Sequence, residues 1–301
     1  NAHANGKITV DANTTIIVDE AGMIGLDDME RLVGSAKETG ARMILSGDTR
    51  QLQPITKGAP MAMLSKPEAC GASVLGEIVR QKDIRQREAS VMMAEGKIKE
   101  GFKTYLDTGR VRFSESALDE TRNAYVEDID ANPLSTRMMG VYRNAHAMTL
   151  NLSTREVLKE KGIIAAEGWT GGAWTRGMNQ RVVEREFCVG ERIIFGESFK
   201  LSDVEISNNT TANIIGIETV AEGEPTFTIR TDDGRTFKAK PSEMVGYRDE
   251  DAKDKTTPKI DYAYAQTVYS LQGSTFDRMF VYAGEAGNAE LAYVMMTRHK
   301  L

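Results

Sequence analysis

Two adjacent carboxylates stand at the end of an apolar run near the start of the sequence. Residues 14–18 read Thr-Thr-Ile-Ile-Val and are followed by Asp19, Glu20 and a small-residue turn. A β-branched run of this kind is typical of a buried parallel strand, and open α/β sheets bind ligands at the carboxyl ends of such strands. There Asp19 can hold Mg²⁺ beside a nucleoside triphosphate, and Glu20 can orient or deprotonate the attacking water. A strand that simply ends in a polar turn explains this stretch equally well.

A second polar turn, residues 47–51, follows the next apolar run at 42–45. Between the two runs, apolar residues recur at helical spacing from 26 to 36, and acidic residues stand in the first turn. Strand, helix and strand in this order predict a parallel unit whose two strand ends lie side by side. Gln51 would then reach a γ-phosphate or its attacking water. An Asx-type turn at Gly47-Asp48 is the simpler explanation of this turn taken alone.

Two arginines follow further predicted elements. Residues 73–79 predict a third strand that runs into Arg80, and an apolar run at 289–296 leads to Arg298. An arginine at the edge of a domain is usually a solvated charge. At the end of this sheet its planar guanidinium can instead stabilise the charge that develops on a transferring phosphoryl group.

Several residues further along the chain have the chemistry to bind a phosphate backbone. Asn144 follows a predicted buried strand at 137–143, where it would cap the next helix. The turn at 272–275, Gln-Gly-Ser-Thr, offers backbone amides and hydroxyls to a phosphate or a ribose. Arg230 and Lys238 belong to a basic hairpin that can track phosphates. Helix capping and a solvated hairpin explain the same residues without a ligand.

The predicted elements divide the sequence into four segments. Residues 1–82 and 83–186 have α/β character, residues 187–258 contain short strands separated by turn residues, and residues 259–301 return to α/β character. The short strands are predicted at 193–195, 214–217, 227–230 and 236–239. The third segment is therefore expected to form a small β-barrel or sandwich inserted into an α/β fold.

Composition and charge narrow the class of protein. A chain of 301 residues with 41% hydrophobic and 27% charged residues can bury more than one core. No apolar run is long enough to span a membrane, and the first residues of the sequence do not resemble a secretory signal. We therefore expect a cytoplasmic protein without membrane insertion. Cys70 and Cys188 lack metal-ligand spacing and do not suggest a disulfide framework. The formal charge of −6 argues against a general polycation but permits a local basic groove.

Taken together, five stretches of this sequence resemble the motifs of superfamily 1 helicases of the RecD-like branch. They follow the family's order for motifs II, III, the arginine-bearing motif after III, V and VI. The stretches are Asp19-Glu20-Ala21-Gly22, Gly47-Asp48-Thr49-Arg50-Gln51-Leu52, Glu77-Ile78-Val79-Arg80-Gln81, Gln272-Gly273-Ser274-Thr275 and Tyr293-Val294-Met295-Met296-Thr297-Arg298. The amino-acid sequences of the first three stretches most resemble the helicase part of conjugative relaxases of the TraI, TrwC and TraA kind. The resemblance extends over nearly the whole sequence.

The resemblance implies tandem RecA-like P-loop NTPase domains with an inserted SH3-like β-barrel. Residues 1–82 would be the C-terminal portion of the first RecA-like domain, and 83–186 with 259–301 would be the second. Residues 187–258 would be the SH3-like insertion. The implied function is an ATP-dependent helicase that moves 5′ to 3′ on single-stranded DNA in plasmid conjugation. Its implied partners are a covalently linked relaxase domain and the conjugation machinery.

The resemblance also implies a role for each matching residue at the nucleotide. Asp19 would bind the Mg²⁺ that accompanies ATP, Glu20 would activate water, and Gln51 would sense the γ-phosphate. Arg80 and Arg298 would be arginine fingers from the two RecA-like domains, so that hydrolysis would require the cleft to close.

For DNA, the resemblance implies that the turn at 272–275 couples the state of the bound nucleotide to the binding of the DNA strand. Gln272, Ser274 and Thr275 would contact DNA, and Gly273 would approach the nucleotide. The further implied DNA contacts are Asn144, Thr267, Arg230 and Lys238.

The sequence departs from the family pattern in two places. It contains no G-x-x-x-x-G-K-[ST] phosphate loop, and Tyr269-Ser270-Leu271 stands where the family has His-Lys-Ser before the glutamine of motif V. We therefore expect the motif II to VI portion of a longer helicase, which would not hydrolyse ATP alone. The alternative is a non-catalytic module that binds single-stranded DNA and derives from a helicase repeat. Retention of all five residues assigned to hydrolysis favours the first interpretation.

Overall fold

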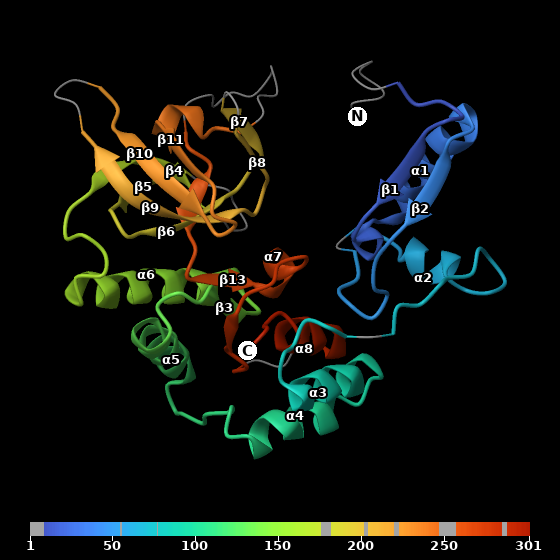
Figure 1. The fold of residues 1–301 in the computed structure, drawn as a ribbon, viewed down its shortest axis with the longest axis horizontal. Helices are drawn as coiled ribbons and strands as arrows, with labels where there is room; N and C mark the ends of the chain where they lie inside the picture. The colour runs from blue at the N-terminus through green and yellow to red at the C-terminus, as the bar shows by residue number, and fades with distance from the viewer. Residues whose placement is uncertain are drawn as a thin grey trace. The chain divides into compact units, whose positions relative to one another are not determined.

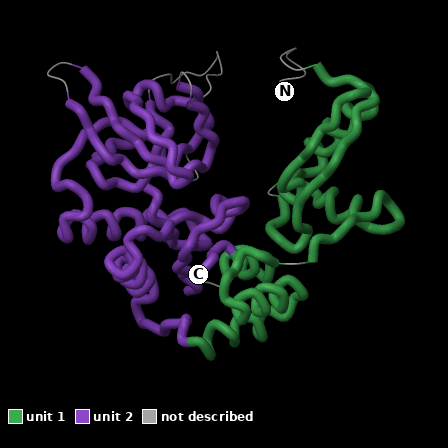
Figure 2. The backbone as a smooth tube through the Cα atoms, viewed as in Figure 1, with its two compact units in different colours: residues 1–108, 288–297 green, residues 109–287, 298–301 purple. Residues whose placement is uncertain are grey.

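The chain forms two compact units, seen in different colours in Figure 2. A computed structural model describes residues 9–54, 56–76, 78–175, 182–201, 204–219, 223–246, 257–284 and 288–301. One unit consists of residues 1–108 and 288–297, and the other of residues 109–287 and 298–301. The division does not follow chain order, because a helix near the end of the chain belongs to the first unit. None of the helices among the described residues has the length and apolar character that crossing a bilayer requires.

The first unit opens with a strand, a helix and a second strand (Figure 1). β1 (Thr15–Val18) and β2 (Arg42–Leu45) pair in parallel, and α1 (Leu26–Thr39) connects them. The helix has Asp27 in its first turn, and Gly40 follows its last residue with a φ of 71°, a left-handed conformation that glycine adopts without strain. The predicted parallel unit is therefore confirmed.

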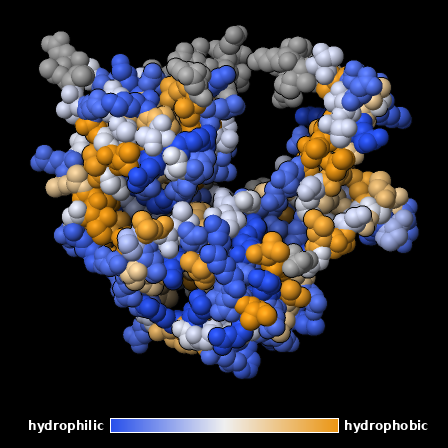
Figure 3. Space-filling model, in the orientation of Figure 1, coloured by the Kyte–Doolittle hydropathy of each residue, from blue (hydrophilic) through white to orange (hydrophobic). Residues whose placement is uncertain are grey.

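The burial predicted for these two strands is wrong. Residues along both strands alternate between exposed and half-buried, and the exposed fractions of Ile17 and Ile44 are 69% and 47%. Figure 3 shows apolar side chains at the surface over β1 and β2. A wholly apolar strand is buried only when elements cover both faces of its sheet. In the described part of the chain this sheet has two strands, with α1 packed against β2.

The predicted third strand is also wrong. After the 3₁₀ turn η1 (Ala21–Met23) and the short helix α2 (Pro60–Leu64), residues 71–76 and 78–80 form no strand. Leu75 is 94% exposed. An apolar run becomes a strand only where a neighbouring backbone pairs with its N–H and C=O groups, and none of the described strands does so here. Glu77 lies outside the described residues.

Three helices complete the first unit. They are α3 (Ile84–Ala94), α4 (Ile98–Asp107) and α8 (Ala289–Met296), and α8 packs against the other two. Gly96, at a φ of 83°, lies between α3 and α4 and separates the two helices. At the crossing of α3 and α4, a Cβ on Gly101 would lie 2.8 Å from the carbonyl oxygen of Ala89. The absence of a side chain at this position lets the two helices approach.

The second unit contains a parallel sheet covered by two helices. Its strand order is β13 (Ala265–Thr267), β3 (Arg137–Val141) and β14 (Arg278–Val281). α5 (Ala117–Ala131) and α6 (Asn144–Glu160) pack on this sheet, and all residues of β3 are buried. The predicted strand at 137–143 and the helix that follows it are confirmed. The residues of β14 are half-buried.

The same unit contains a larger antiparallel sheet. Its order is β11 (Thr236–Ala239), β10 (Thr226–Thr231), β9 (Thr211–Glu218), β6 (Arg192–Phe195) and β12 (Ile260–Tyr262). Two hairpins accompany it, β4 (Trp169–Trp174) with β5 (Val182–Phe187) and β7 (Phe199–Leu201) with β8 (Val204–Ile206). The short elements η2 (Pro241–Glu243) and α7 (Val268–Leu271) complete the described structure. The four strands predicted between 193 and 239 are confirmed.

The parallel sheet and the antiparallel sheet of the second unit share one hydrophobic core. Met139 of β3, Leu150 of α6, Phe195 of β6 and Phe227 of β10 belong to one continuous cluster of buried residues. The β strands are therefore packed directly against the α/β part, and the two parts do not have separate cores.

A cluster of charged side chains also joins α6 to the β strands. Arg155 donates to Glu191 Oε2 and Glu186 Oε2, each at 2.8 Å, and the Tyr264 hydroxyl donates to Glu191 Oε1 at 2.6 Å. Burial raises the pKa of Glu191, which is fully buried. Partial burial works to raise the pKa of Glu186 as well, but hydrogen bonds from Lys159 and Arg155 outweigh it and bring that pKa to about 2.

We predict that Gly101→Ala destabilises the first unit by about 1–3 kcal/mol, because the new methyl group must displace α3 or α4. The matched control is Gly34→Ala, also inside a helix, where a Cβ would have nothing within 4 Å. The control should raise stability by about 0.5–1 kcal/mol, since alanine favours helix more than glycine does. Denaturant unfolding followed by circular dichroism measures both. Equal effects of the two substitutions would contradict the close helix crossing.

We predict that Glu186→Gln costs about 1 kcal/mol of stability at pH 7. The folded pKa of Glu186 is lowered from 4.5 to about 2. Its contribution is therefore fully present above pH 4.5 and is lost as the pH falls toward 2. The difference in unfolding free energy between parent and variant should shrink over that range. Glu184→Gln, at an exposed position of the same strand, is the control and should cost less than about 0.5 kcal/mol.

Candidate functional site

Two polar turns meet at the carboxyl ends of β1 and β2. The Ser46 amide donates to the Val18 carbonyl at 2.8 Å, and the Ala21 amide donates to the Ser46 carbonyl at 2.8 Å. A Cβ on Gly47 would lie 3.1 Å from the backbone nitrogen of Ala21, so glycine permits this close approach. The Asp19-Glu20 pair and the 48–51 turn are thereby neighbours, as the order of the elements predicted.

The first turn carries a strained backbone at Glu20. Its φ of 50° and ψ of 37° are left-handed, and among the described residues only Asn209 is another non-glycine with positive φ. Such a conformation costs a residue with a Cβ about 1–2 kcal/mol. The turn is closed by the Glu20 amide, which donates to Asp19 Oδ1 at 3.0 Å. Strained residues of this kind cluster at functional sites, because the fold must maintain them at a cost.

Asp48 is the centre of the second turn, and its side chain forms the Asx-type turn that the sequence offered as the simpler explanation of this stretch. Its Oδ1 accepts from the Arg50 amide at 3.0 Å and from Arg50 Nε at 2.8 Å. Its Oδ2 accepts from Gln51 Nε2 at 3.4 Å and from the Tyr293 hydroxyl at 3.2 Å. Burial works to raise the pKa of Asp48, but the hydrogen bonds and charge of Arg50 outweigh it, and the pKa is lowered. An ionised carboxylate therefore organises the turn that carries Gln51.

The donor set at these turns fits a magnesium ion that is shared with a phosphate. Asp19 presents an exposed carboxylate at the strand end. Mg²⁺ is usually held by one or two carboxylates together with waters and substrate phosphates. No group of three or more histidine, cysteine, aspartate or glutamate side chains gathers to hold a metal among the described residues. An ion at Asp19 would therefore take most of its ligands from water and phosphate oxygens.

Arg80 lies in a bend and not at the end of a strand, and its side chain reaches the C-terminal end of helix α8. Its Nη1 donates to the Thr297 carbonyl at 2.8 Å, and Nε2 of the buried Gln81 donates to the same oxygen at 3.0 Å. Thr297 directly follows α8, where the helix dipole favours a positive charge. The next residue in the chain is Arg298. The first unit thus places Arg80 against the backbone segment that leads to the second predicted arginine.

In the second unit, Arg298 is 1% exposed and its carbonyl accepts from the Phe276 amide at 2.9 Å. The chain beside it contains the predicted 272–275 turn, which follows α7. Gly273 is exposed at a φ of 77°, and the Ser274 amide donates to the Leu271 carbonyl at 3.0 Å. The flanking side chains are half-buried; they are Gln272, Ser274 and Thr275.

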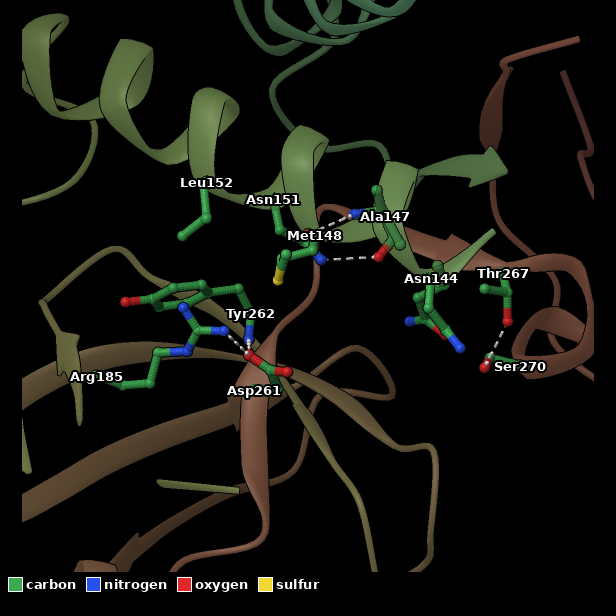
Figure 4. A pocket seen from close by; sticks show the side chains of 12 residues that line it. Asn144, Ala147, Met148, Asn151, Leu152, Arg185, Asp261, Tyr262, Thr267 and Ser270 are labelled. Atoms are coloured by element: carbon green, nitrogen blue, oxygen red, sulfur yellow. Dashed lines mark hydrogen bonds and ion pairs between the residues drawn. The ribbon is translucent and has the colours of Figure 1, made fainter. Parts of the chain in front are cut away.

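Asn144 and Thr267 line one end of a small pocket in the second unit (Figure 4). The Thr267 and Ser270 hydroxyl oxygens are 3.1 Å apart there, and at the other end Arg185 forms an ion pair with Asp261 at 3.6 Å. The pocket encloses about 30 Å³. A water molecule needs about 10–15 Å³ on this measure, so the pocket has room for water but not for a nucleobase.

The capping role predicted for Asn144 is wrong. Asn144 is the first residue of α6, Arg143 occupies the capping position with a φ of −112° and a ψ of 143°, and no side chain caps this end. The strand β3 ends at Val141, so the chain turns into the helix one residue earlier than the capping pattern suggested. Asn144 is exposed at the helix start.

The predicted basic hairpin carries less net positive charge than its lysine and arginine residues alone suggest. Arg230 and Lys238 are exposed on β10 and β11, and the Lys238 ammonium forms an ion pair with Glu218 of β9. Arg235 forms an ion pair with Asp233, and its hydrogen bonds lower the pKa of that carboxyl to about 2. Carboxylates contributed by the hairpin and by the neighbouring strand offset much of the positive charge.

Comparisons with known proteins show which families and folds this chain resembles. The AAA domain family matches residues 2–116. A probable conjugal transfer protein TraA from Sinorhizobium fredii is 28% identical over 298 residues, which are 98% of this chain and 24% of that protein. The chain therefore spans about a quarter of the length of the curated relatives it matches.

Solved structures agree in fold. The Pif1 helicase from Candida albicans has a TM-score of 0.64 and 16% identity over 95% of this chain and 69% of its own. The Bacteroides Pif1 helicase, solved with ADP-AlF3 and single-stranded DNA, has a TM-score of 0.61 and 18% identity over 96% of this chain and 68% of its own. This likeness shows a common α/β fold of the P-loop NTPase type.

We predict that Glu20→Gly is about 1 kcal/mol more stable than Glu20→Ala, because glycine adopts the left-handed conformation without strain. Both substitutions remove the same carboxylate, so the comparison isolates the backbone. Thermal or denaturant unfolding of the two variants gives the difference. Equal stability would show that Glu20 is not strained.

Proposed function

Since the chain is a superfamily 1 helicase related to the conjugative relaxases, we propose that it is the motif II to VI portion of an ATP-driven motor. This motor moves along single-stranded DNA during conjugative transfer. The meeting of the two polar turns at the ends of β1 and β2 carries the proposal. It gathers a carboxylate pair and a glutamine at the edge of a parallel sheet, where nucleotides bind in α/β folds.

In this proposal the first unit supplies most of the groups that act on ATP, and Arg298 and Gly273 come from the second unit. Asp19 would hold Mg²⁺, which would neutralise charge on the phosphates, and Glu20 orients and deprotonates the attacking water. Gln51 responds to the γ-phosphate from the turn organised by Asp48. Arg80 and Arg298 stabilise the developing charge, with Gly273 close to the nucleotide. Both arginines must leave or adjust their present surroundings to do so, which makes hydrolysis dependent on conformation.

The second unit supplies most of the proposed DNA contacts. Gln272, Ser274 and Thr275 form a turn beside an exposed glycine, and such a turn offers backbone amides to phosphates. Thr267 and Asn144 lie at one end of the pocket of Figure 4, and we propose that their hydroxyl and amide groups contact a phosphate or sugar at the surface and not inside the pocket. Arg230 and Lys238 of the β10–β11 hairpin are the peripheral contacts, weakened by the carboxylates around them.

The proposal extends to domain organisation. We propose that 1–82 is part of one RecA-like domain, and that 83–186 with 259–301 forms another. The strands within 187–258 would be an SH3-like insertion, a suggestion supported by their antiparallel order and short hairpins. In the full-length protein, a linked relaxase domain would deliver the DNA strand on which the motor acts.

We predict that Glu20→Gln in the full-length protein lowers DNA-stimulated ATP hydrolysis by at least about 100-fold, because the amide cannot accept a proton from water. Nucleotide binding should change by less than about threefold, since the substitution retains the shape of the side chain. Phosphate release measures the first quantity and fluorescent-nucleotide titration the second. The control is Glu30→Gln on the exposed face of α1, which should leave both quantities unchanged.

Equal turnover in Glu20→Gln and the parent would remove Glu20 from its role. A full-length parent that binds single-stranded DNA but shows no DNA-stimulated hydrolysis would replace the motor with a non-catalytic binding module.

A further inference from the structure

Tyr293 connects helix α8 to the turn that carries Gln51. Its side chain is buried, at 6% exposure, and its hydroxyl lies 3.2 Å from Asp48 Oδ2. The same oxygen accepts from Gln51 Nε2 at 3.4 Å. One carboxylate oxygen is therefore shared by the proposed γ-phosphate sensor and by a tyrosine 245 residues away from Asp48 in the sequence.

Further hydrogen bonds connect Tyr293, along α8, to the Arg80 side chain. The Thr297 hydroxyl donates to the Tyr293 carbonyl at 2.7 Å, and the Thr297 carbonyl accepts from Arg80 and Gln81. Thr297 is 4% exposed, so these three bonds lie in a protected environment. All of these contacts belong to the first unit. The Gln51 turn, α8 and Arg80 are thus joined by consecutive hydrogen bonds.

Three side chains donate to Asp48 Oδ2: Gln51 at 3.4 Å, Tyr293 at 3.2 Å and Arg50 Nη2 at 3.3 Å. A hydroxyl that donates to a carboxylate usually lies about 2.5–2.7 Å from it, so the Tyr293 bond is longer than such a bond needs to be. A carboxylate oxygen that loses one donor binds its remaining donors more strongly, and here these are Tyr293 and Arg50. Departure of the Gln51 amide toward a phosphate would therefore shorten the bond from Tyr293 and draw α8 toward the turn.

We propose that Tyr293 is a positioning residue that couples the state of Gln51 to helix α8. This inference rests on the proposed function, in which Gln51 responds to the γ-phosphate. With phosphate present, Gln51 turns away from Asp48, the Tyr293 bond tightens, and α8 carries Thr297 and the segment after it into the hydrolysis-competent position. After phosphate leaves, the Gln51 amide returns to Asp48 and α8 relaxes.

The structure offers a matched control for this role. Tyr105 of α4 is also buried, and its hydroxyl also ties α8, through the Met296 carbonyl at 3.1 Å. Tyr293→Phe and Tyr105→Phe each remove one hydroxyl that holds α8 in the first unit. If the hydroxyls served only to dock the helix, both substitutions would act alike. Coupling predicts that only Tyr293→Phe affects the Gln51 turn.

Hydrogen exchange in the full-length protein without nucleotide tests the connection itself. The Arg50 and Gln51 amides donate to Asp48, so they report how firmly that residue is held. Tyr293→Phe should speed exchange in residues 47–52 by about fivefold or more, because Asp48 loses a donor. Tyr105→Phe should leave that exchange unchanged. Unchanged exchange in Tyr293→Phe, or an equal increase in both variants, would overturn the inference.

Steady-state kinetics then test the role. For DNA-stimulated ATP hydrolysis, Tyr293→Phe should lower kcat about tenfold and leave KM for ATP within about twofold, because coupling acts after binding. Tyr105→Phe should leave both within about twofold. A parent without DNA-stimulated hydrolysis would refute the proposed function, and the exchange experiment would still decide the Tyr293 connection. An active parent with unchanged kcat in Tyr293→Phe would refute the coupling alone.

Discussion

The parallel pairing of β1 with β2 is the constraint on which the candidate nucleotide site depends. Because the two strands run in the same direction and in register, their carboxyl ends lie together, and so do the turns that follow. Gly47 permits the turns to approach, and the Ala21 and Ser46 amides bond across the strand ends. Neither turn alone has more than ordinary loop chemistry, and their juxtaposition makes a site.

The second turn owes its shape to one ionised group. Asp48 accepts hydrogen bonds from a backbone amide, a guanidinium, a side-chain amide and a phenol. An acceptor with so many donors fixes the positions of all of them, because each donor would lose a charge-assisted bond by moving away. The same group therefore holds Gln51 beside the strand ends and Tyr293 on α8, and it makes the first unit responsive to changes at either residue.

The second unit is built on a different principle. Its parallel sheet, its helices and its antiparallel strands share one apolar core, and a charged cluster around Glu191 joins α6 to the strands at the edge of that core. Buried charges of this kind are costly to separate, since each would be left without a partner. A movement of the unit is therefore expected to carry its α/β part and its β part together, with the proposed DNA contacts on both.

The sequence by itself determined the local elements and the order of the motifs. Side-chain periodicity and turn residues are set by hydrogen bonds within a segment, so β1, β2, α1, β3, α6 and four strands of the antiparallel sheet were predictable. It also placed Asp19, Glu20 and Gln51 at neighbouring strand ends, because a strand, a helix and a strand leave few arrangements.

Only the tertiary structure decided which faces are covered and which distant side chains meet. The exposure of Ile17, the failure of residues 73–79 to form a strand, and the pairing of Lys238 with Glu218 all depend on neighbours that local pattern does not specify. The same holds for the bonds from Arg80 to Thr297 and from Tyr293 to Asp48, which span 217 and 245 residues. These contacts arise because α8 returns to the first unit, and periodicity within a helix does not encode where the helix packs.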